Sequence, residues 1–459
     1  MKMFFTVIIL LFSVTLKSQS FNEILVYFNT DGGTQNSIAA ADFDNDGLKD
    51  VLMASSNPNV FWVKNLGNNQ FGPKIGLFDE EVFGECAKPI DINNDGNMDI
   101  AAVCSFSNIV ITILGNGDGT FQEAIVIEDN LEPLVDLKVF DVNQDGYDDL
   151  TYSTYSSVDK IGKVYWSKND GNGGFIERKI IAPSALETNN IEFADLNNDQ
   201  LPDLVSKSRW DDKFTWFQNF GNDVFSSEIE IRPPLSSLGN RPLFSIDIDD
   251  DNDIDLLTYE NEGIAIFTND GEGNFMSESI STSSYTWGIS ASDFNHDGVI
   301  DIFCGLGSNK EAIILYGSSE GAYQNELILA SDVGHIIDIW IEDMDNNGTL
   351  DILTASSLYD GYVLFSNQNE LSTINLVNNY PEIEVFPNPA TNYIYLKTSE
   401  SIMSSLELID LTGRSVYYED LHKSKYAEVN TSNLIKGYYS LIIKDNRGKI
   451  ISKHKIIKQ

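Results

Sequence analysis

The chain has 459 residues, of which 42% are hydrophobic and 11% aromatic, a composition that excludes a disordered or collagen-like chain. Its 70 Asp and Glu against 29 Lys and Arg give a formal net charge of −41, which would repel nucleic-acid phosphates and anionic lipid headgroups and argues against either partner. The excess lies in residues 21–380, with 61 acidic and 16 basic residues, whereas residues 381–459 hold 9 and 11. This asymmetry predicts separate modules, with metal cations bound to the first.

Residues 1–20 carry a lysine near the start, an apolar run from Met3 to Leu16 and small polar residues after it. This pattern predicts a secretory signal peptide that is cleaved near Ser18 to Ser20. A membrane anchor is the alternative, but the run is shorter than the roughly 20 residues that a spanning helix needs. We therefore expect no transmembrane segment.

An acidic segment of the pattern DxDxDGxxD recurs along residues 21–368, at intervals of about 50 residues. Each copy lies between two short runs of alternating apolar residues, and a third run, a turn with Asn or Gly and a fourth run that opens with an aromatic residue follow it. Four strands in each of seven repeats predict an all-β fold, a seven-bladed β-propeller. The segments begin at Asp42, Asp91, Asp141, Asp195, Asp247, Asp293 and Asp343.

The seventh repeat lacks its fourth strand, and the N-terminal part of the module supplies a candidate. Residues 21–28, FNEILVYF, have the fourth-strand pattern. The spacing from Phe21 to Asp42 matches, within a few residues, the spacing from each of the other aromatic residues to the next acidic segment. We predict that this strand completes blade seven and closes the ring, which leaves no blade with an open edge.

The acidic segments have the chemistry of calcium loops. Positions 1, 3, 5 and 9 carry side-chain oxygen donors, position 7 can offer a backbone carbonyl, and Gly at position 6 permits a sharp turn around a cation. The alternative is that Asp, Asn and Gly simply form turns, but seven segments in register favour metal. Gln200 and Asn252 replace the glycine in two loops, which makes these sites less regular. We predict up to seven structural Ca²⁺ ions.

The predicted metal ligands are Asp42, Asp44, Asp46, Leu48, Asp50, Asp91, Asn93, Asp95, Asn97, Asp99, Asp141, Asn143, Asp145, Tyr147, Asp149, Asp195, Asn197, Asp199, Leu201, Asp203, Asp247, Asp249, Asp251, Asp253, Asp255, Asp293, Asn295, Asp297, Val299, Asp301, Asp343, Asp345, Asn347, Thr349 and Asp351.

Together with turns such as NLGNNQF and NFGNDVF, these segments resemble the FG-GAP or VCBS-type repeats of integrin-α-like propellers. The resemblance covers residues 21 to about 368. It implies that the calcium loop joins the first and second strands of a blade and is structural, and that ligands bind the face formed by the other loops.

After a polar linker, residues 369–380, the chain changes character. Alternating strands and Gly turns in residues 381–459 predict a small β-sandwich. The segments EVFPNPATNYIYLKT and LELIDLTGRSVYYED and the strands after them are similar to a C-terminal sorting domain of the bacterial type IX secretion system; a generic carbohydrate-binding β-domain is the alternative. The resemblance implies that the type IX machinery is a partner and that the protein is secreted or displayed on the outer cell surface.

Two of the three cysteines are spaced so that they could form a disulfide. Cys86 lies five residues before Asp91 and Cys104 five residues after Asp99, so a symmetric hairpin would place them opposite one another. A disulfide between them is then one of two alternatives in an oxidising compartment. We expect Cys304 to be a small buried residue of a blade.

Few residues of the propeller point to catalysis. No Gly-rich phosphate loop, zinc spacing or GxSxG elbow appears; His296 lies in an acidic segment, and His335 is an isolated histidine. Trp62, Trp166 and Trp216 share one register in their repeats and are expected in the core.

Residues that break the repeat pattern are better candidates for ligand binding, although packing is the alternative for each. They are Tyr155, Arg209, Trp210, Arg241, Tyr285, Trp287 and Tyr359. We therefore expect an exported, calcium-stabilised propeller that binds a polysaccharide or a cell-surface or extracellular protein, for adhesion or capture. The alternative is a secreted polysaccharide lyase or glycoside hydrolase on the same scaffold.

Overall fold

The computed structural model describes most of the chain after residue 20. The described residues are 21–458 except 29–33, 57–59, 79–83, 157–160, 187, 209–212, 233–241, 261–262, 283, 319–320, 324, 358–360, 369–382, 388–389, 399–402, 410–414, 433, 435 and 445–449. The predicted signal peptide and linker fall outside them. The chain divides into two units, Met1–Glu370 and Leu371–Gln459, and each is described by itself. Within the described part every element is a strand, so no helix there can cross a membrane.

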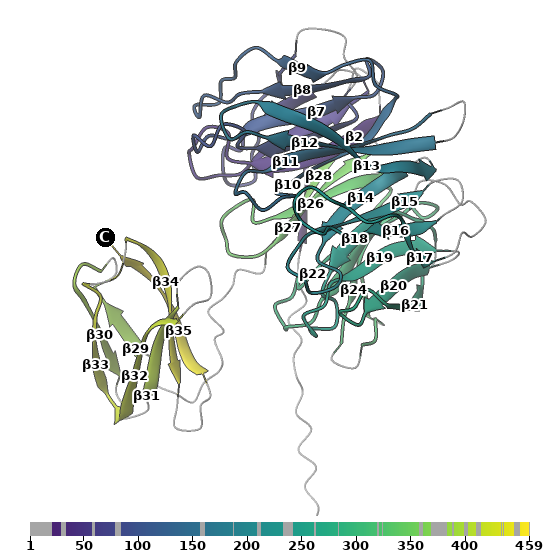
Figure 1. The fold of residues 1–459 in the computed structure, drawn as a ribbon. Helices are drawn as coiled ribbons and strands as arrows, with labels where there is room; N and C mark the ends of the chain where they lie inside the picture. Colours follow the sequence, from purple (N-terminus) through teal and green to yellow (C-terminus); the bar gives the residue numbers. More distant parts are fainter. Residues whose placement is uncertain are drawn as a thin grey trace, which may run out of the picture. The chain divides into compact units, whose positions relative to one another are not determined.

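The first unit is built from antiparallel four-stranded sheets that repeat along the chain (Figure 1). In chain order their strands are β2 (Gln35–Ala41), β3 (Asp50–Ser55), β4 (Val60–Val63) and β5 (Ile75–Gly76); β6 (Cys86–Ile90), β7 (Asp99–Cys104), β8 (Ile109–Ile113) and β9 (Ile125–Glu128); β10 (Leu134–Phe140), β11 (Asp149–Thr154), β12 (Ile161–Asn169) and β13 (Phe175–Leu186); β14 (Thr188–Ala194), β15 (Asp203–Ser208), β16 (Phe214–Phe217) and β17 (Ile229–Arg232); β18 (Leu243–Ile246), β19 (Asp255–Glu260), β20 (Gly263–Asn269) and β21 (Phe275–Ser281); β22 (Thr286–Ser292), β23 (Asp301–Leu306), β24 (Glu311–Tyr316) and β25 (Asn325–Ser331).

The last sheet of this unit joins distant parts of the chain. It has the order β1 (Phe21–Phe28), β28 (Gly361–Asn367), β27 (Asp351–Ser356) and β26 (Ile336–Glu342). β1 runs antiparallel to β28, with Phe21 opposite Asn367 and Phe28 opposite Gly361, and a bulge between Leu25 and Tyr27. The pairing that the sequence predicts for residues 21–28 is therefore confirmed.

The first strand of each sheet contacts the first strands of its neighbours. β2 contacts β6, β6 contacts β10, and the same relation continues through β14, β18, β22 and β26. β26 in turn contacts β2. Repeated four-stranded sheets in this arrangement fit a β-propeller.

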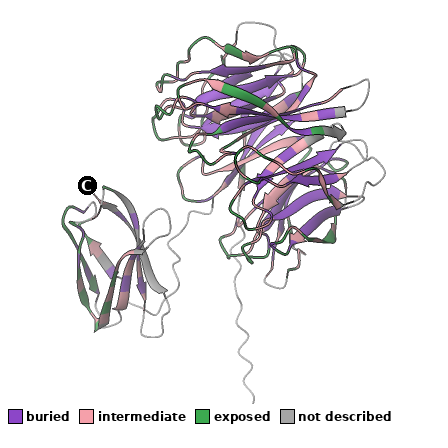
Figure 2. Ribbon diagram, viewed as in Figure 1, coloured by how far each residue is buried: buried purple, intermediate pink, exposed green. Residues whose placement is uncertain are grey.

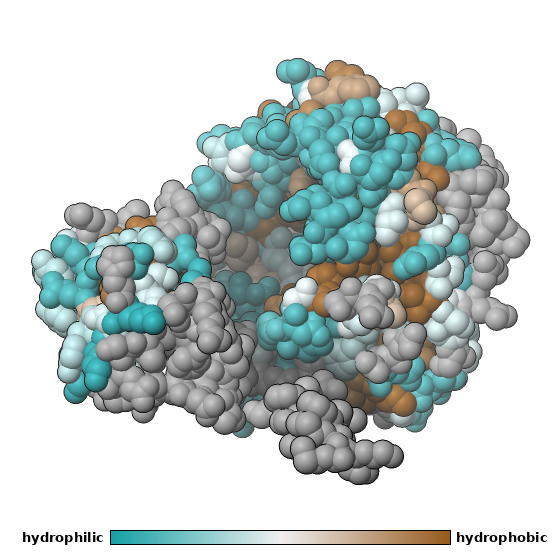
Figure 3. All heavy atoms as spheres, turned by 90° about the horizontal axis from the view of Figure 1, so that it is seen from below, coloured by the Kyte–Doolittle hydropathy of each residue, from teal (hydrophilic) through white to brown (hydrophobic). Residues whose placement is uncertain are grey.

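The core lies between neighbouring sheets, because the central strands are covered on both faces. All six residues are buried in each of β3, β7, β11, β15, β23 and β27, whereas outer strands such as β21 are mostly exposed (Figure 2). Trp62 of β4 packs against Ile100 of β7 in one such layer. Trp62, Trp166 and Trp216 are all buried, which confirms their predicted place in the core. On the face drawn in Figure 3, the described surface of the unit is largely hydrophilic with hydrophobic patches.

Of the two alternatives for Cys86 and Cys104, the structure has the free thiols, because the strand register is shifted by one residue from the symmetric hairpin. Cys86 pairs with Val103, so Cys104 points to the opposite face of the sheet. The two side chains lie in different core layers, one with Leu137 and the other with Trp62. Cys86, Cys104 and Cys304 are free and buried.

The second unit has two facing sheets. One has the order β29 (Ile383–Phe386), β30 (Tyr393–Thr398), β33 (Tyr426–Asn430), and the other has β32 (Ser415–Ser424), β31 (Met403–Ile409), β34 (Gly437–Lys444), β35 (Ile450–Lys458). Burial alternates strictly along β30, and Ile394 and Leu396 share one core with Leu406 and Leu441 of the other sheet. This packing fits the predicted β-sandwich.

Candidate metal centres

Each acidic segment forms the loop between the first and second strands of its sheet. In the first loop the backbone has positive φ at Asn45 (56°) and at Gly47 (88°), a conformation that glycine and asparagine tolerate best. Gln200 (68°) and Asn252 (72°) adopt the same conformation where the two irregular loops lack glycine. Both loops therefore keep the common backbone despite the substitution.

The first carboxylate of each loop accepts hydrogen bonds from the loop's own backbone. Asp42 Oδ1 accepts the N–H of Asp46 at 3.1 Å, and its Oδ2 accepts the N–H of Gly47 at 2.8 Å. Corresponding pairs of bonds recur in the other six loops. The backbone thus curls around this carboxylate.

The ninth residue of each loop is an Asp at the start of the second strand, and it is fully buried. Asp50 Oδ2 accepts the N–H of Phe43 at 3.2 Å, and Oδ1 accepts the N–H of Asn65 at 2.8 Å. The other six loops repeat both bonds. One carboxylate therefore ties together the loop, the second strand and the end of the third.

Burial makes these ninth carboxylates unusually basic. It raises the pKa of Asp50 to about 7, and the nearby charges of Asp44 and Asp46 add to the effect. The same causes raise the pKa to about 7 or about 6 in the other loops, at Asp203, Asp301, Asp351, Asp99, Asp149 and Asp255. A nearby positive charge would therefore favour the ionised form of the carboxylate at this position.

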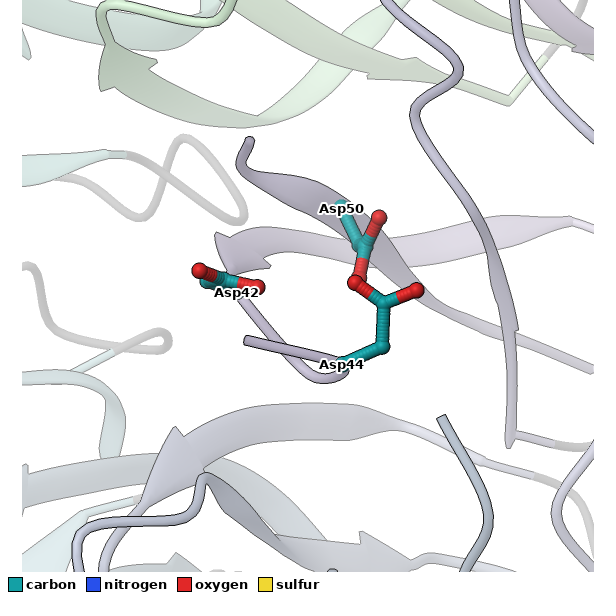
Figure 4. Close-up of side chains that lie close together, drawn as sticks. All are labelled: Asp42, Asp44 and Asp50. Carbon is teal, nitrogen blue, oxygen red and sulfur yellow. The ribbon is translucent and has the colours of Figure 1, made fainter. Parts of the chain in front are cut away.

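Three loops bring carboxylate oxygens close enough to hold a metal ion. Within the described residues, oxygens from Asp42, Asp44 and Asp50 all lie within 4.8 Å of one another, and so do those of two further sets, Asp247, Asp249 and Asp251, and Asp343, Asp345 and Asp351. In the first set Asp44 and Asp50 point toward one another, with Asp42 beside them (Figure 4).

The donor set of these loops fits calcium, which binds carboxylate and carbonyl oxygens. Asp44 Oδ1 is buried and has no hydrogen-bond partner, as expected for an oxygen placed to bind a cation. In the second, third, fourth and sixth loops the third position is Asn, which offers an amide oxygen instead.

Two lysines already place positive charge against the loops. Lys64, at the end of the third strand, contacts the carboxylate of Asp44 and lies 2.8 Å from Asp46 Oδ2. Lys168 stands at the corresponding place in the third sheet, 3.0 Å from Asp145 Oδ2. These contacts raise the pKa of both lysines. A metal ion in either loop would compete with the ammonium group.

The structure describes only some of the predicted ligand-binding residues. Arg209, Trp210, Arg241 and Tyr359 lie outside the described residues. Tyr155 is half-buried, and its N–H donates to Pro133 at 2.9 Å.

Tyr285 and Trp287 come together with His335, which the sequence gives no reason to select. The rings of Tyr285 and Trp287 meet edge to face at 6.0 Å, and His335 stacks on Trp287 at 5.3 Å with an interplanar angle of 18°. Tyr285 is 39% exposed. We call these three residues the aromatic cluster. It lies where β22 and β26 begin, at the strand ends away from the acidic loops.

Trp287 also borders a cavity of about 960 Å³ among the first strands of the sheets. We call this space the axial cavity. Its lining includes Lys88, Lys138, Glu192 and Trp340.

Comparison with known proteins assigns both units. The FG-GAP-like repeat matches residues 42–102, 91–152, 141–206 and 247–304, and the secretion system C-terminal sorting domain matches residues 384–459. The chain carries FG-GAP-like repeats followed by a sorting domain. The sorting domain indicates export by the type IX system, so this FG-GAP protein is secreted or located at the cell surface.

Solved structures agree on the fold of the FG-GAP unit. A lectin from Agrocybe aegerita, described as recognising non-reducing terminal N-acetylglucosamine, is 20% identical with a TM-score of 0.51 over 65% of this chain and 81% of its own. BBS1N in its complex with ARL6DN, in a mercury-soaked crystal, is 10% identical with a TM-score of 0.52 over 76% of this chain and 99% of its own. Both support a propeller fold alone. No curated protein matches the chain.

Proposed function

We propose that this protein is an exported, calcium-stabilised, seven-bladed propeller that binds a polysaccharide outside the cell. In this proposal residues 1–20 direct the first export step, residues 21–368 form a ring closed by β1, and residues 381–459 direct the type IX step after the linker 369–380.

Structural calcium is supported by the repeated loop geometry. Every loop orients backbone amides toward its first carboxylate and buries its ninth. Gathering three or four carboxylates in one loop is unfavourable without a cation, because like charges repel in a partly buried setting. Up to seven Ca²⁺ ions would offset this repulsion and stabilise the first turn of every blade.

The observation that carries polysaccharide binding is the aromatic cluster. Tyr285 is exposed, and Trp287 is held in place by stacking on His335. Rigid aromatic faces at the entrance to a cavity suit the apolar face of a sugar ring. His335 takes part as a stacked ring, which favours binding over catalysis. The lectin with a similar fold is described as binding a sugar, and this agrees with the proposal.

A glycan array probed with the calcium-loaded protein tests this function, with release of reducing ends measured in parallel. We expect binding to a defined group of glycans and no release. Release of reducing ends would instead assign the protein to the lyases or hydrolases. Absence of binding to every glycan, with binding to a surface protein, would move the function to protein capture. Arg209, Trp210, Arg241, Tyr359 and Tyr155 stay predicted contacts, to be tested by alanine substitution on the same array.

A further inference from the structure

The first strands of the sheets present to the axis one position whose residue varies among the blades. It lies three residues before the first Asp of each acidic segment. Its occupants along the axial cavity are Lys88, Lys138, Glu192, Phe244, Ser290 and Trp340. The second strands beside them are buried along their whole length in six of the seven sheets, because every sheet packs on two neighbours. The axial position has no such shared packing role, so its chemistry is free to serve a ligand.

We propose that the axial cavity binds the terminal sugar of a neutral saccharide, with the aromatic cluster supporting the sugar next to it. This inference rests on the proposed polysaccharide binding and names its site and ligand class. The cavity volume of about 960 Å³ lies within the range of ligand sites, about 300–1,000 Å³.

The charges inside the cavity disfavour an anionic ligand, because its lining holds five acidic residues, Glu85, Asp136, Asp148, Glu192 and Asp338, against two lysines. Lys138 Nζ lies 2.6 Å from Glu192 Oε1, and Lys88 Nζ lies 3.6 Å from Asp338 Oδ2. An anionic ligand would be repelled by this acidic excess and would have to draw a lysine away from its partly buried carboxylate partner. A hydroxyl group both donates and accepts hydrogen bonds, so it can contact a carboxylate and an ammonium group while the pair stays intact.

The carboxylate of Asp338 is held in a fixed position. Its Oδ2 accepts the N–H of Ile38 from the next sheet at 2.9 Å, and its Oδ1 accepts the N–H of Ile339 at 2.9 Å. Lys88 is in turn held between this carboxylate and the ring of Trp340, whose centroid lies 5.5 Å from Nζ. The polar groups are therefore preorganised, which lowers the entropic cost of binding.

The aromatic cluster is also fixed before a ligand arrives. A side chain at Gly307 would place its Cβ 2.0 Å from the Tyr285 ring, so glycine is required for the ring to lie against this backbone. His335 has its pKa lowered by burial and by the charge of Lys310, which keeps the imidazole neutral at neutral pH. The entrance therefore offers aromatic faces without charge.

The test measures binding of four trisaccharides to the calcium-loaded protein by titration calorimetry: chitotriose, cellotriose, maltotriose and, as the acidic probe, trigalacturonate. We expect at least one neutral trisaccharide to bind and trigalacturonate to bind at least tenfold more weakly. Trp287→Ala, at the entrance, and the double variant Lys138→Met with Glu192→Leu, inside the cavity, should each weaken that binding at least tenfold. The double variant exchanges a whole ion pair for apolar groups, which proteins commonly tolerate.

Phe220→Ala is the matched control, because Phe220 is an exposed aromatic residue outside the predicted binding set and does not line the cavity. It should bind as the unaltered protein does, and all variants should keep the same melting temperature. If Trp287→Ala and the double variant both bind normally, the axial site is wrong and saccharide binding elsewhere stands. Stronger binding of trigalacturonate overturns the ligand class. If none of the four binds the unaltered protein, the axial site is overturned; if the glycan array is also empty, polysaccharide binding fails with it.

Discussion

The side-chain amide of Asn65 donates a 2.8 Å hydrogen bond to the carbonyl of Met344, 279 positions later in the chain. The same amide donates to Lys49 of its own loop at 3.0 Å. Asn219, Asn269 and Asn367 stand at the corresponding turn and donate to the carbonyls of Val142, Leu196 and Phe294. In each case the turn of one sheet binds the acidic loop of the sheet before it. These amides therefore link neighbouring sheets on the side where metal would bind.

Replacing Asn65 by Ala should lower the free energy of unfolding by about 1–3 kcal/mol, because the buried carbonyls of Met344 and Lys49 lose their donor. Urea denaturation measures the change. Asn172→Ala is the control, since Asn172 is exposed in a similar turn and bonds only locally to Asp170. Equal stability of the two variants would show that the contact between sheets contributes nothing.

Calcium removal should lower the melting temperature substantially. Each independent site stabilises the folded state by about 2.7 kcal/mol when free calcium is a hundred times the dissociation constant. Scanning calorimetry with calcium and with a chelator measures the difference, and the bound metal is quantified in both samples. An unchanged melting curve, with metal present in one sample and removed from the other, contradicts a structural role.

Lys64→Met should make the protein depend more on calcium. Without the ammonium group, Asp44 and Asp46 repel one another, so the metal-free protein should lose about 0.5–1 kcal/mol, while the ion gains a site with no competitor. The rise in melting temperature on adding calcium should therefore be larger than in the unaltered protein. Lys49→Met removes the same charge from the same loop without touching the Lys64 contacts. Equal calcium responses in both variants would rule out competition by Lys64.

The metal-free protein should become more stable as the pH falls from 8 to 5. The ninth carboxylates have a folded pKa of about 6 to 7, above the ordinary value of about 4 that applies after unfolding. Between these values the folded state binds more protons, so the free energy of unfolding rises as the pH falls. Calcium should reverse this trend, because it binds ionised carboxylates. The melting temperature is measured across this pH range with chelator and with calcium. If it changes with pH in the same way in both series, the prediction is contradicted.

Deleting residues 21–28 should abolish cooperative unfolding or cause aggregation, because β28 would lose its partner and become an open edge. Deleting residues 381–459 should leave the melting of the first unit nearly unchanged, since the second unit has its own core. Both truncated proteins are produced without residues 1–20 and compared by scanning calorimetry and light scattering. Similar behaviour of the two would contradict ring closure by β1.

The repeat made much of the fold predictable. A periodic pattern repeated along the chain shows which runs are equivalent strands, and the aromatic spacing was sufficient to pair residues 21–28 with β28. Register within a hairpin was not predictable to one residue. Asp99 belongs to β7 because its carboxylate binds the N–H groups of Ile92 and Gly115, whereas Asp91 stays in the loop. This asymmetry moves Val103 opposite Cys86.

The candidate sites also differ in how far they could be predicted from the sequence. The acidic loops repeat in sequence, so the residues expected to bind metal could be assigned one loop at a time. His335 stands alone in the sequence, and only the packing of β22 beside β26 brings it against Trp287. The axial residues vary among the blades, so no repeated motif marks Lys138 and Glu192 in the sequence. An alignment of the repeats to one another would mark that position as the variable one.

The last sheet also constrains when the protein can fold. β1 is made first, and its partner β28 is the last strand of the first unit among the described residues. At roughly 5–20 residues per second, the ribosome needs about 20 to 70 seconds to make the stretch that separates them. A chain that enters the export path with its N-terminus first carries β1 away from β28 during transit. The sheet therefore cannot be completed until both ends of the unit have arrived in the same compartment.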